Sequence, residues 1–117
     1  MAIADRFQPE LRPKDIRQEM GLSREKMGYI MSVSAKTIEN WERRDQLPAD
    51  EEKRNRLAAI AELAHLGLLV YGTDGLPLFL RTPLRSLGNH TPLQEIMAGR
   101  VERVVEVLAS EYEGLGF

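Results

Sequence analysis

The stretch SREKMGYIMSVSAKTIENWERR, residues 23–44, decides the fold of this chain. Ser23 and Ser34 each stand directly before a run with helical spacing, where a serine hydroxyl caps the free backbone N–H groups at a helix start. Only two residues separate the first run from the second cap. The stretch therefore predicts a helix over about 24–31, a tight turn, and a second helix over about 35–44.

Two helices can cross at a steep angle over a short turn only where a small residue lies at the crossing, and Gly28 is in that position. Apolar residues of both helices would fill the contact between them, and Trp41 would lie beneath it. These residues are Met27, Met31, Val33 and Ile38. This pattern is typical of a helix-turn-helix, a motif whose second helix enters the major groove of DNA.

Residues 10–56 resemble the Xre or Cro-type repressors, whose motif ends in a run similar to Ser-Ala-Lys-Thr-Ile-Glu-Asn-Trp-Glu-Arg followed by a proline. The resemblance implies that residues 34–44 read the major groove. Asparagine pairs with adenine, arginine or lysine pairs with guanine, and an alanine methyl meets the thymine methyl. The residues assigned to the bases are Ser34, Ala35, Lys36, Glu39, Asn40 and Arg43, and those assigned to phosphates are Arg24, Thr37 and Arg44.

Two features weaken this DNA-binding interpretation. The family prefers glycine where this chain has Ser32, so the turn either holds a strained left-handed residue or takes another geometry. The negative charges of Glu39 and Glu42 also reduce the positive electrostatic potential of the second helix. A helical hairpin with a merely solvated charged surface is the alternative.

The composition is that of an ordinary globular protein, with 117 residues, 43% of them apolar, and a formal charge of −2. A chain of this length forms one compact domain or two small ones. Apolar residues recur at three- and four-residue spacing almost throughout, which predicts an all-α fold. Without a cysteine there is no disulfide or zinc finger, and without a secretory signal or an uninterrupted apolar span we expect a cytoplasmic protein with no membrane partner.

Further helices are expected on both sides of the motif. Pro13 begins one, and Gly21 ends it in a left-handed conformation. Asp50 caps a long helix that is apolar on nearly every side over residues 57–71, which predicts burial in the core or at a subunit interface. Over residues 72–89, glycines and prolines allow only short turns or a brief helix near 77–80.

The remainder of the chain carries one strong helix start and one regular helix. Thr91 and Gln94 form a capping-box pattern, with Pro92 at the first helical position. Valines from Val101 onward have helical spacing, whereas residues 111–117 show no periodicity and are expected to form a tail.

Residues 79–99, FLRTPLRSLGNHTPLQEIMAG, resemble the toxin-binding domain of the Xre/MbcA/ParS antitoxins. In that family a tryptophan–leucine pair and Thr-Pro precede a Leu-Gly-Gly-x-x-Pro-Leu run. Phe79 replaces the tryptophan here and Asn89 replaces the second glycine. With the first resemblance, this divides the chain into a DNA-binding domain over 1–56 and a toxin-binding domain over 57–117.

The two resemblances together imply an antitoxin of a bacterial type II toxin-antitoxin pair, whose partner is similar to the RES-domain toxins that consume NAD. Inhibition would be steric, and the same chain would repress its own operon as a homodimer or a higher toxin-antitoxin assembly on operator DNA. The residues expected at the toxin surface are Pro83, Leu87, Gly88, Asn89, Pro92, Tyr112, Leu115 and Phe117. The alternatives are a stand-alone dimeric Xre-type repressor and a pure inhibitor that has lost DNA binding.

Catalysis by this chain is not expected. His65 and His90 lie far apart in the sequence, and neither a glycine-rich phosphate loop nor a metal-ligand spacing is present. We therefore predict that the protein is not an enzyme and needs no cofactor or metal.

Overall fold

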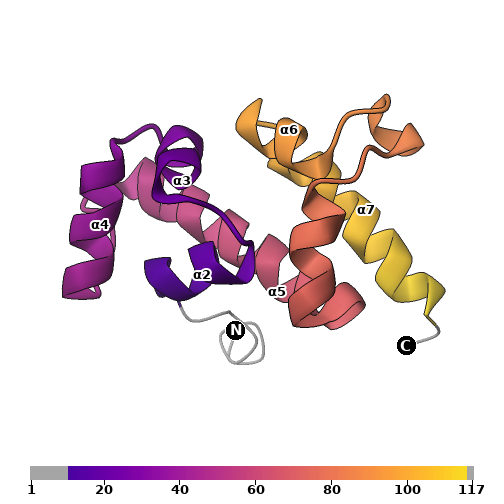
Figure 1. Ribbon diagram of the computed structural model, residues 1–117, viewed down its shortest axis with the longest axis horizontal. Helices are drawn as coiled ribbons and strands as arrows, with labels where there is room; N and C mark the ends of the chain where they lie inside the picture. The colour runs from indigo at the N-terminus through magenta and orange to yellow at the C-terminus, as the bar shows by residue number, and fades with distance from the viewer. Residues whose placement is uncertain (1–10, 116–117) are drawn as a thin grey trace.

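The computed structural model describes residues 11–115, and over this range the protein is all-α, as the sequence predicts (Figure 1). Within these residues, β-type pairing is limited to one isolated antiparallel bridge between Leu84 and His90. The helices are α2 (Pro13–Glu19), α3 (Arg24–Met31), α4 (Ala35–Arg44), α5 (Glu51–Leu80), α6 (Pro92–Met97) and α7 (Val101–Gly114), with a 3-10 turn η1 (Arg85–Leu87).

The predicted helix starts are confirmed by hydrogen bonds from the backbone to the capping side chains. Ser23 and Ser34 each accept the N–H of the residue three positions later at 3.1 Å, and Asp50 does so at 3.0 Å. Thr91 forms the full capping box with Gln94. Gly21 takes the left-handed conformation after α2. These local signals therefore place the starts of α3, α4, α5 and α6 and the end of α2 correctly.

The helix α5 is longer than expected and is kinked at Gly72, whose φ of 76° and ψ of −179° suit only glycine. After the kink the chain is helical to Leu80 and passes through Pro77. The brief helix expected near 77–80 is present, but it is part of a longer helical segment that begins directly after the kink. The extension forms because its apolar side, which includes Leu76 and Phe79, is buried and stabilises the helix despite the proline.

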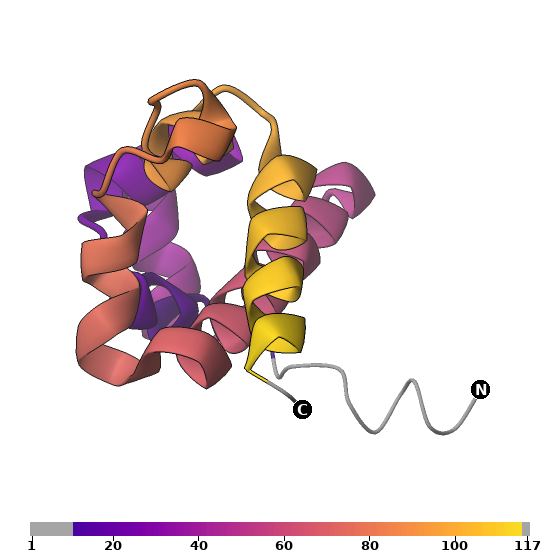
Figure 2. The same cartoon turned by 90° about the vertical axis from the view of Figure 1, so that its right-hand side faces the viewer.

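A continuous core joins both parts of the chain, and α5 lies between them (Figures 1 and 2). The boundary expected between residues 56 and 57 falls inside α5. Burial along this helix is one-sided after its first half, because Leu69 remains 51% exposed in the single chain. The core is formed by Ile16, Met20, Leu22, Met27, Ile30, Met31, Ile38, Leu57, Ile60, Ala61, Leu63, Ala64, Leu76, Phe79, Leu80, Leu93, Ile96, Val101, Val104 and Leu108.

By length and composition alone, α5 is also long and apolar enough to cross a membrane. The core helix of a soluble protein meets the same criteria. Since α5 packs against α2 and α7 through fully buried leucines, and a kink interrupts it, we interpret it as a core helix.

The last helix is also longer than expected. The structure continues α7 to Gly114, so residues 111–114 are helical and are not a free tail. The hydroxyl of Tyr71, on α5, donates a hydrogen bond to the carboxylate of Glu111. Burial, followed by the hydrogen bond and the charge of Glu111, raises the pKa of Tyr71 well above its usual value. The tail expectation failed because this contact comes from a segment 40 residues away.

Candidate functional site

The helix α4 lies at one end of the molecule, where the residues assigned to DNA share an accessible side (Figure 1). Ile38 points into the core and is 1% exposed. The side chains of Ser34, Lys36, Arg43 and Arg44 are exposed, and those of Ala35, Thr37, Glu39 and Asn40 are partly exposed. The structure therefore brings the predicted base-reading residues together on one accessible surface.

Several of these side chains form pairs along α4. Lys36 donates to Glu39 at 3.1 Å, and Arg43 donates to the Oδ1 atom of Asn40 at 3.0 Å. The Lys36 hydrogen bond and charge hold the pKa of Glu39 below its usual value. These exposed pairs are weak, so Lys36, Asn40 and Arg43 can leave their partners for other contacts at little cost.

Two of the residues assigned to phosphates have partners inside the protein. The hydroxyl of Thr37 lies 3.0 Å from that of Ser34, so it takes part in the cap of α4. The Nε atom of Arg24 donates to Glu42 at 3.2 Å, although 43% of the Arg24 side chain remains exposed. A phosphate contact by either residue stays a prediction, and for Arg24 it would use the exposed part of the guanidinium group.

Glu42 has a structural role that the sequence analysis missed. Its side chain is 2% exposed and accepts hydrogen bonds from Arg17 on α2, at 2.5 and 3.0 Å, as well as from Arg24 on α3. Burial by itself would raise the pKa of this carboxyl, but the hydrogen bonds and charges of the two arginines outweigh it and lower the pKa. The charge of Glu42 is thus compensated internally, and this carboxylate ties together α2, α3 and α4.

The turn between α3 and α4 resolves the question left open at Ser32. This residue takes the left-handed conformation, with φ 58° and ψ 42°, at the end of α3. The predicted role of Gly28 is confirmed as well, because a Cβ atom there would lie 2.6 Å from the carbonyl oxygen of Val33. The two helices therefore approach closely at Gly28, and Ser32 occupies the position where the repressors that residues 10–56 resemble have glycine.

The loop that precedes α6 is held by backbone hydrogen bonds. The N–H of Leu84 donates to His90 at 3.0 Å, and the N–H of Asn89 donates back to Leu84 at 2.9 Å. Gly88 and Asn89 both have a φ of 67° and are exposed, so they form a tight turn at the tip of the loop. Pro83 is also exposed beside it.

Other residues expected at the toxin surface lie elsewhere. Leu87 is 2% exposed and Pro92 is buried, so the expectation that their side chains contact a partner is corrected. Tyr112 is partly buried within α7, and Leu115 is 53% exposed at the end of that helix. Phe117 lies outside the described residues. The corrections arise because apolar loop residues pack inward when the loop folds back on its own helix.

Glu95 is a second buried carboxylate that sequence reasoning did not find. It accepts hydrogen bonds from His90 at 3.1 Å and from Arg100 at 2.5 Å, and Arg103 lies at 3.5 Å. The hydrogen bonds from Arg100 and His90 lower the pKa of Glu95 to about 2. This cluster fixes the Asn89 loop to the start of α7. Within residues 11–115, no three acidic or histidine side chains are grouped so that they could hold a metal ion.

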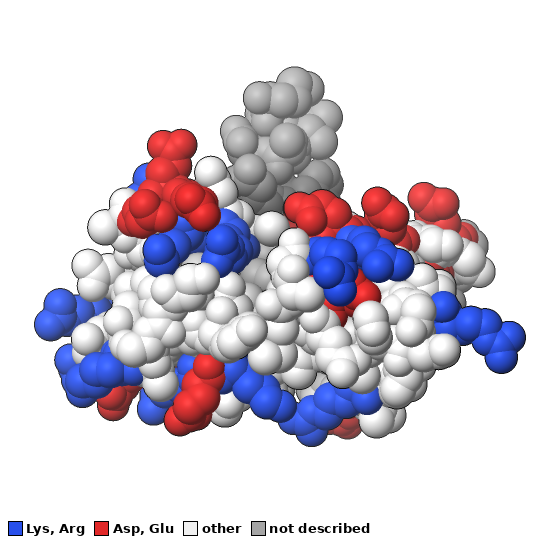
Figure 3. Space-filling view, turned by 90° about the horizontal axis from the view of Figure 1, so that it is seen from above, with Lys and Arg blue, Asp and Glu red and all other residues white. Residues whose placement is uncertain are grey.

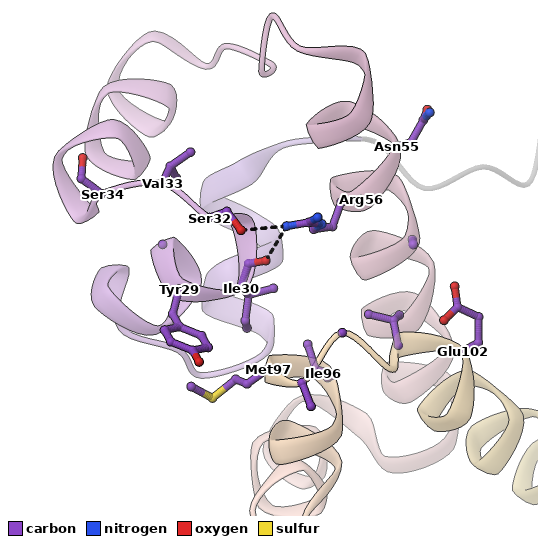
Figure 4. A pocket seen from close by; sticks show the side chains of 15 residues that line it. Tyr29, Ile30, Ser32, Val33, Ser34, Asn55, Arg56, Ile96, Met97 and Glu102 are labelled. Atoms are coloured by element: carbon purple, nitrogen blue, oxygen red, sulfur yellow. Dashed lines mark hydrogen bonds between the residues drawn. The ribbon is translucent and has the colours of Figure 1, made fainter.

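A groove of about 970 Å³ runs between the α3–α4 turn, the first half of α5 and the connection from α6 to α7 (Figure 4). Tyr29 and Met97 stand at its edge, and the side chain of Arg56 crosses toward Ser32. On the surface seen in Figure 3, positive and negative side chains alternate around a broad uncharged area.

Comparison with known proteins gives one informative similarity. No protein-family model matches the sequence, and no curated protein matches it. Among solved structures, the fold is similar to a chain of the M. tuberculosis MbcT-MbcA toxin-antitoxin complex, with a TM-score of 0.72 and 22% sequence identity. The similarity covers 88% of this chain and 92% of that chain. It therefore extends over both the α4 half and the Asn89 loop half of the fold.

Proposed function

We propose that this protein is an antitoxin, which binds a toxin through its C-terminal half and binds operator DNA through α4. The observation that carries this proposal is the fold shared over 88% of the chain with a component of a toxin-antitoxin complex. Two sequence resemblances, one in each half, point to the same function independently of that comparison.

The DNA-binding part of the proposal is supported by the exposed side of α4. Lys36, Asn40 and Arg43 are side chains that recognise base edges, and they stand on a helix whose opposite side is anchored by Ile38. Since Arg17 and Arg24 compensate the charge of Glu42, that residue repels a phosphate less than the sequence alone suggests. A homodimer would present two such helices to a pseudo-palindromic operator.

The toxin-binding part is supported by the loop that Glu95 holds in place. Its tip at Gly88 and Asn89 is exposed and rigidly bonded, and it lies toward the end of the molecule away from α4 (Figure 1). A preformed loop loses little conformational entropy on binding, which favours tight association. The partner we propose is a RES-type toxin that consumes NAD, blocked sterically. The antitoxin itself would be a cytoplasmic protein without catalytic activity.

Co-expression with the product of the adjacent gene tests this function. The complex is purified through a tag on this chain alone, and NAD consumption is assayed before and after the chain is stripped away. Recovery of a silent enzyme that becomes active on release supports the antitoxin role. If nothing co-purifies, the toxin-binding part is wrong and a stand-alone dimeric repressor is the better description. No gel shift of promoter DNA, even at low salt, would instead leave a pure inhibitor.

A further inference from the structure

The turn that leads into α4 is held from outside by a side chain of α5. Arg56 donates from one guanidinium nitrogen to the carbonyl oxygen of Ile30 at 3.2 Å and to the hydroxyl of Ser32 at 3.1 Å (Figure 4). Its other terminal nitrogen donates to Glu52 at 3.3 Å, one turn earlier on α5. The guanidinium group thus bridges two helices that are separated by α4 in the sequence.

The Ile30 carbonyl and Ser32 are both stabilised by a hydrogen-bond donor at this place, each for its own reason. The Ile30 carbonyl lies in the last turn of α3, where carbonyl groups have no partner further along the helix. Ser32 is left-handed, a conformation that is unfavourable for a residue with a Cβ atom. A cation at this end of α3 is also favoured by the helix dipole.

The position of α4 depends on this turn. Ser32 lies two residues before Ser34, whose hydroxyl caps α4, and the carbonyl of Val33 between them rests against Gly28. A change of backbone conformation at Ser32 would therefore move the N-terminal part of α4, where Ala35 and Lys36 are located.

We infer that Arg56 is a positioning residue for DNA recognition: it holds Ser32 in the left-handed conformation that glycine would adopt without help, and so sets the placement of α4. This inference rests on the proposed DNA-binding function. It assigns to a residue outside the helix-turn-helix a role in operator specificity.

The test combines Arg56→Ala with Ser32→Gly. Affinity is measured for a duplex from the promoter region of the protein's own gene and for a scrambled duplex of the same length. We expect Arg56→Ala to raise the Kd for the promoter duplex about tenfold, the size of one lost hydrogen bond to a charged group, with little change for the scrambled duplex. Ser32→Gly should restore the Kd of the Arg56→Ala protein to within about threefold, because glycine takes the left-handed conformation without strain.

Lys53→Ala is the matched control, since it removes a positive charge from the same helix without touching the turn. A contrary result would be equal weakening for both duplexes with a salt slope reduced by about one, which identifies Arg56 as a direct phosphate contact. Failure of Ser32→Gly to rescue, or an unchanged Kd in Arg56→Ala, would likewise overturn the inference.

A thermal measurement separates this inference from the proposed function. Arg56→Ala should lower the Tm by about 5 °C with Ser32 present and clearly less in the Ser32→Gly background. If the unmodified protein binds neither duplex, the DNA-binding proposal fails, and equal Tm losses in the two backgrounds would then also refute the Arg56–Ser32 coupling.

Discussion

The Nε atom of Arg100 donates to the buried carboxylate of Glu95 at 2.5 Å, and this contact ties the start of α7 to α6. His90 approaches the other oxygen of the same carboxylate at 3.1 Å. One buried charge therefore joins the exposed Asn89 loop to the last helix of the protein.

This cluster predicts a loss of stability in acid. The pKa of Glu95 is lowered from its ordinary value near 4.5 to about 2, so its contribution is fully present above pH 4.5 and is lost as the pH falls toward 2. Thermal unfolding followed by circular dichroism should show the Tm of the unmodified protein falling over this window. In Glu95→Gln the Tm should be lower at neutral pH and should fall less on acidification. If the Tm of both proteins fell equally with pH, Glu95 would not be the source of the acid sensitivity.

The Glu42 cluster predicts a strong effect of Arg17→Ala. This substitution leaves a buried carboxylate with Arg24 as its remaining partner, so the free energy of unfolding should fall by about 2 to 3 kcal/mol. Urea denaturation measures it. Arg12→Ala is the control, because the pairs that Arg12 forms with Asp15 and Asp45 are exposed and their loss should cost less than about 1 kcal/mol. Equal costs would show that burial of Glu42 is unimportant.

The close approach of α3 to the following turn predicts that Gly28 tolerates no side chain. A Cβ atom would lie 2.6 Å from the backbone oxygen of Val33, so Gly28→Ala should destabilise the protein by about 1 to 3 kcal/mol. Gly114→Ala is the matched control, since a Cβ atom there meets nothing within 4 Å. Alanine should be neutral or slightly stabilising at that helical position. Denaturant unfolding of both variants compares them directly.

The surface of α4 predicts two distinguishable DNA-binding defects. Asn40→Ala should weaken binding to the specific operator by about 1 to 3 kcal/mol, while binding to unrelated DNA stays nearly unchanged. Arg44→Ala should weaken binding to all DNA alike, because a phosphate contact carries no sequence information. Gel shifts with operator and scrambled duplexes, each at two salt concentrations, test both. If Asn40→Ala weakened binding to all DNA and Arg44→Ala weakened binding to the operator alone, the roles predicted for these two residues would be wrong.

The end of α7 predicts where the chain can be shortened. Glu111 accepts the hydroxyl of Tyr71 and lies within the helix, so truncation before it should lower the Tm. Removal of residues 115–117 should spare folding and DNA binding but impair neutralisation of the toxin, because Leu115 is half exposed. Growth rescue during toxin co-expression measures neutralisation. Full rescue by the shortened chain would refute the role of this end.

Local signals in the sequence were sufficient to predict the helices of the first half and the starts of α3, α4, α5 and α6. Ser23, Ser34, Asp50 and Thr91 all cap as expected, because a cap involves only residues three positions apart. The predicted base-reading residues also share an accessible side, since helical spacing determines which residues lie on one side of a helix.

The sequence by itself thus determined an all-α fold, the helix-turn-helix and the position of its crossing glycine, all of which depend on neighbours along the chain. Only the tertiary structure decided that Glu42 and Glu95 are buried ion-pair centres, that Leu87 points inward, and that α5 continues beyond Gly72. The physical reason is that burial and compensation of charge depend on partners brought together by packing. Arg17, for example, meets Glu42 from 25 residues away.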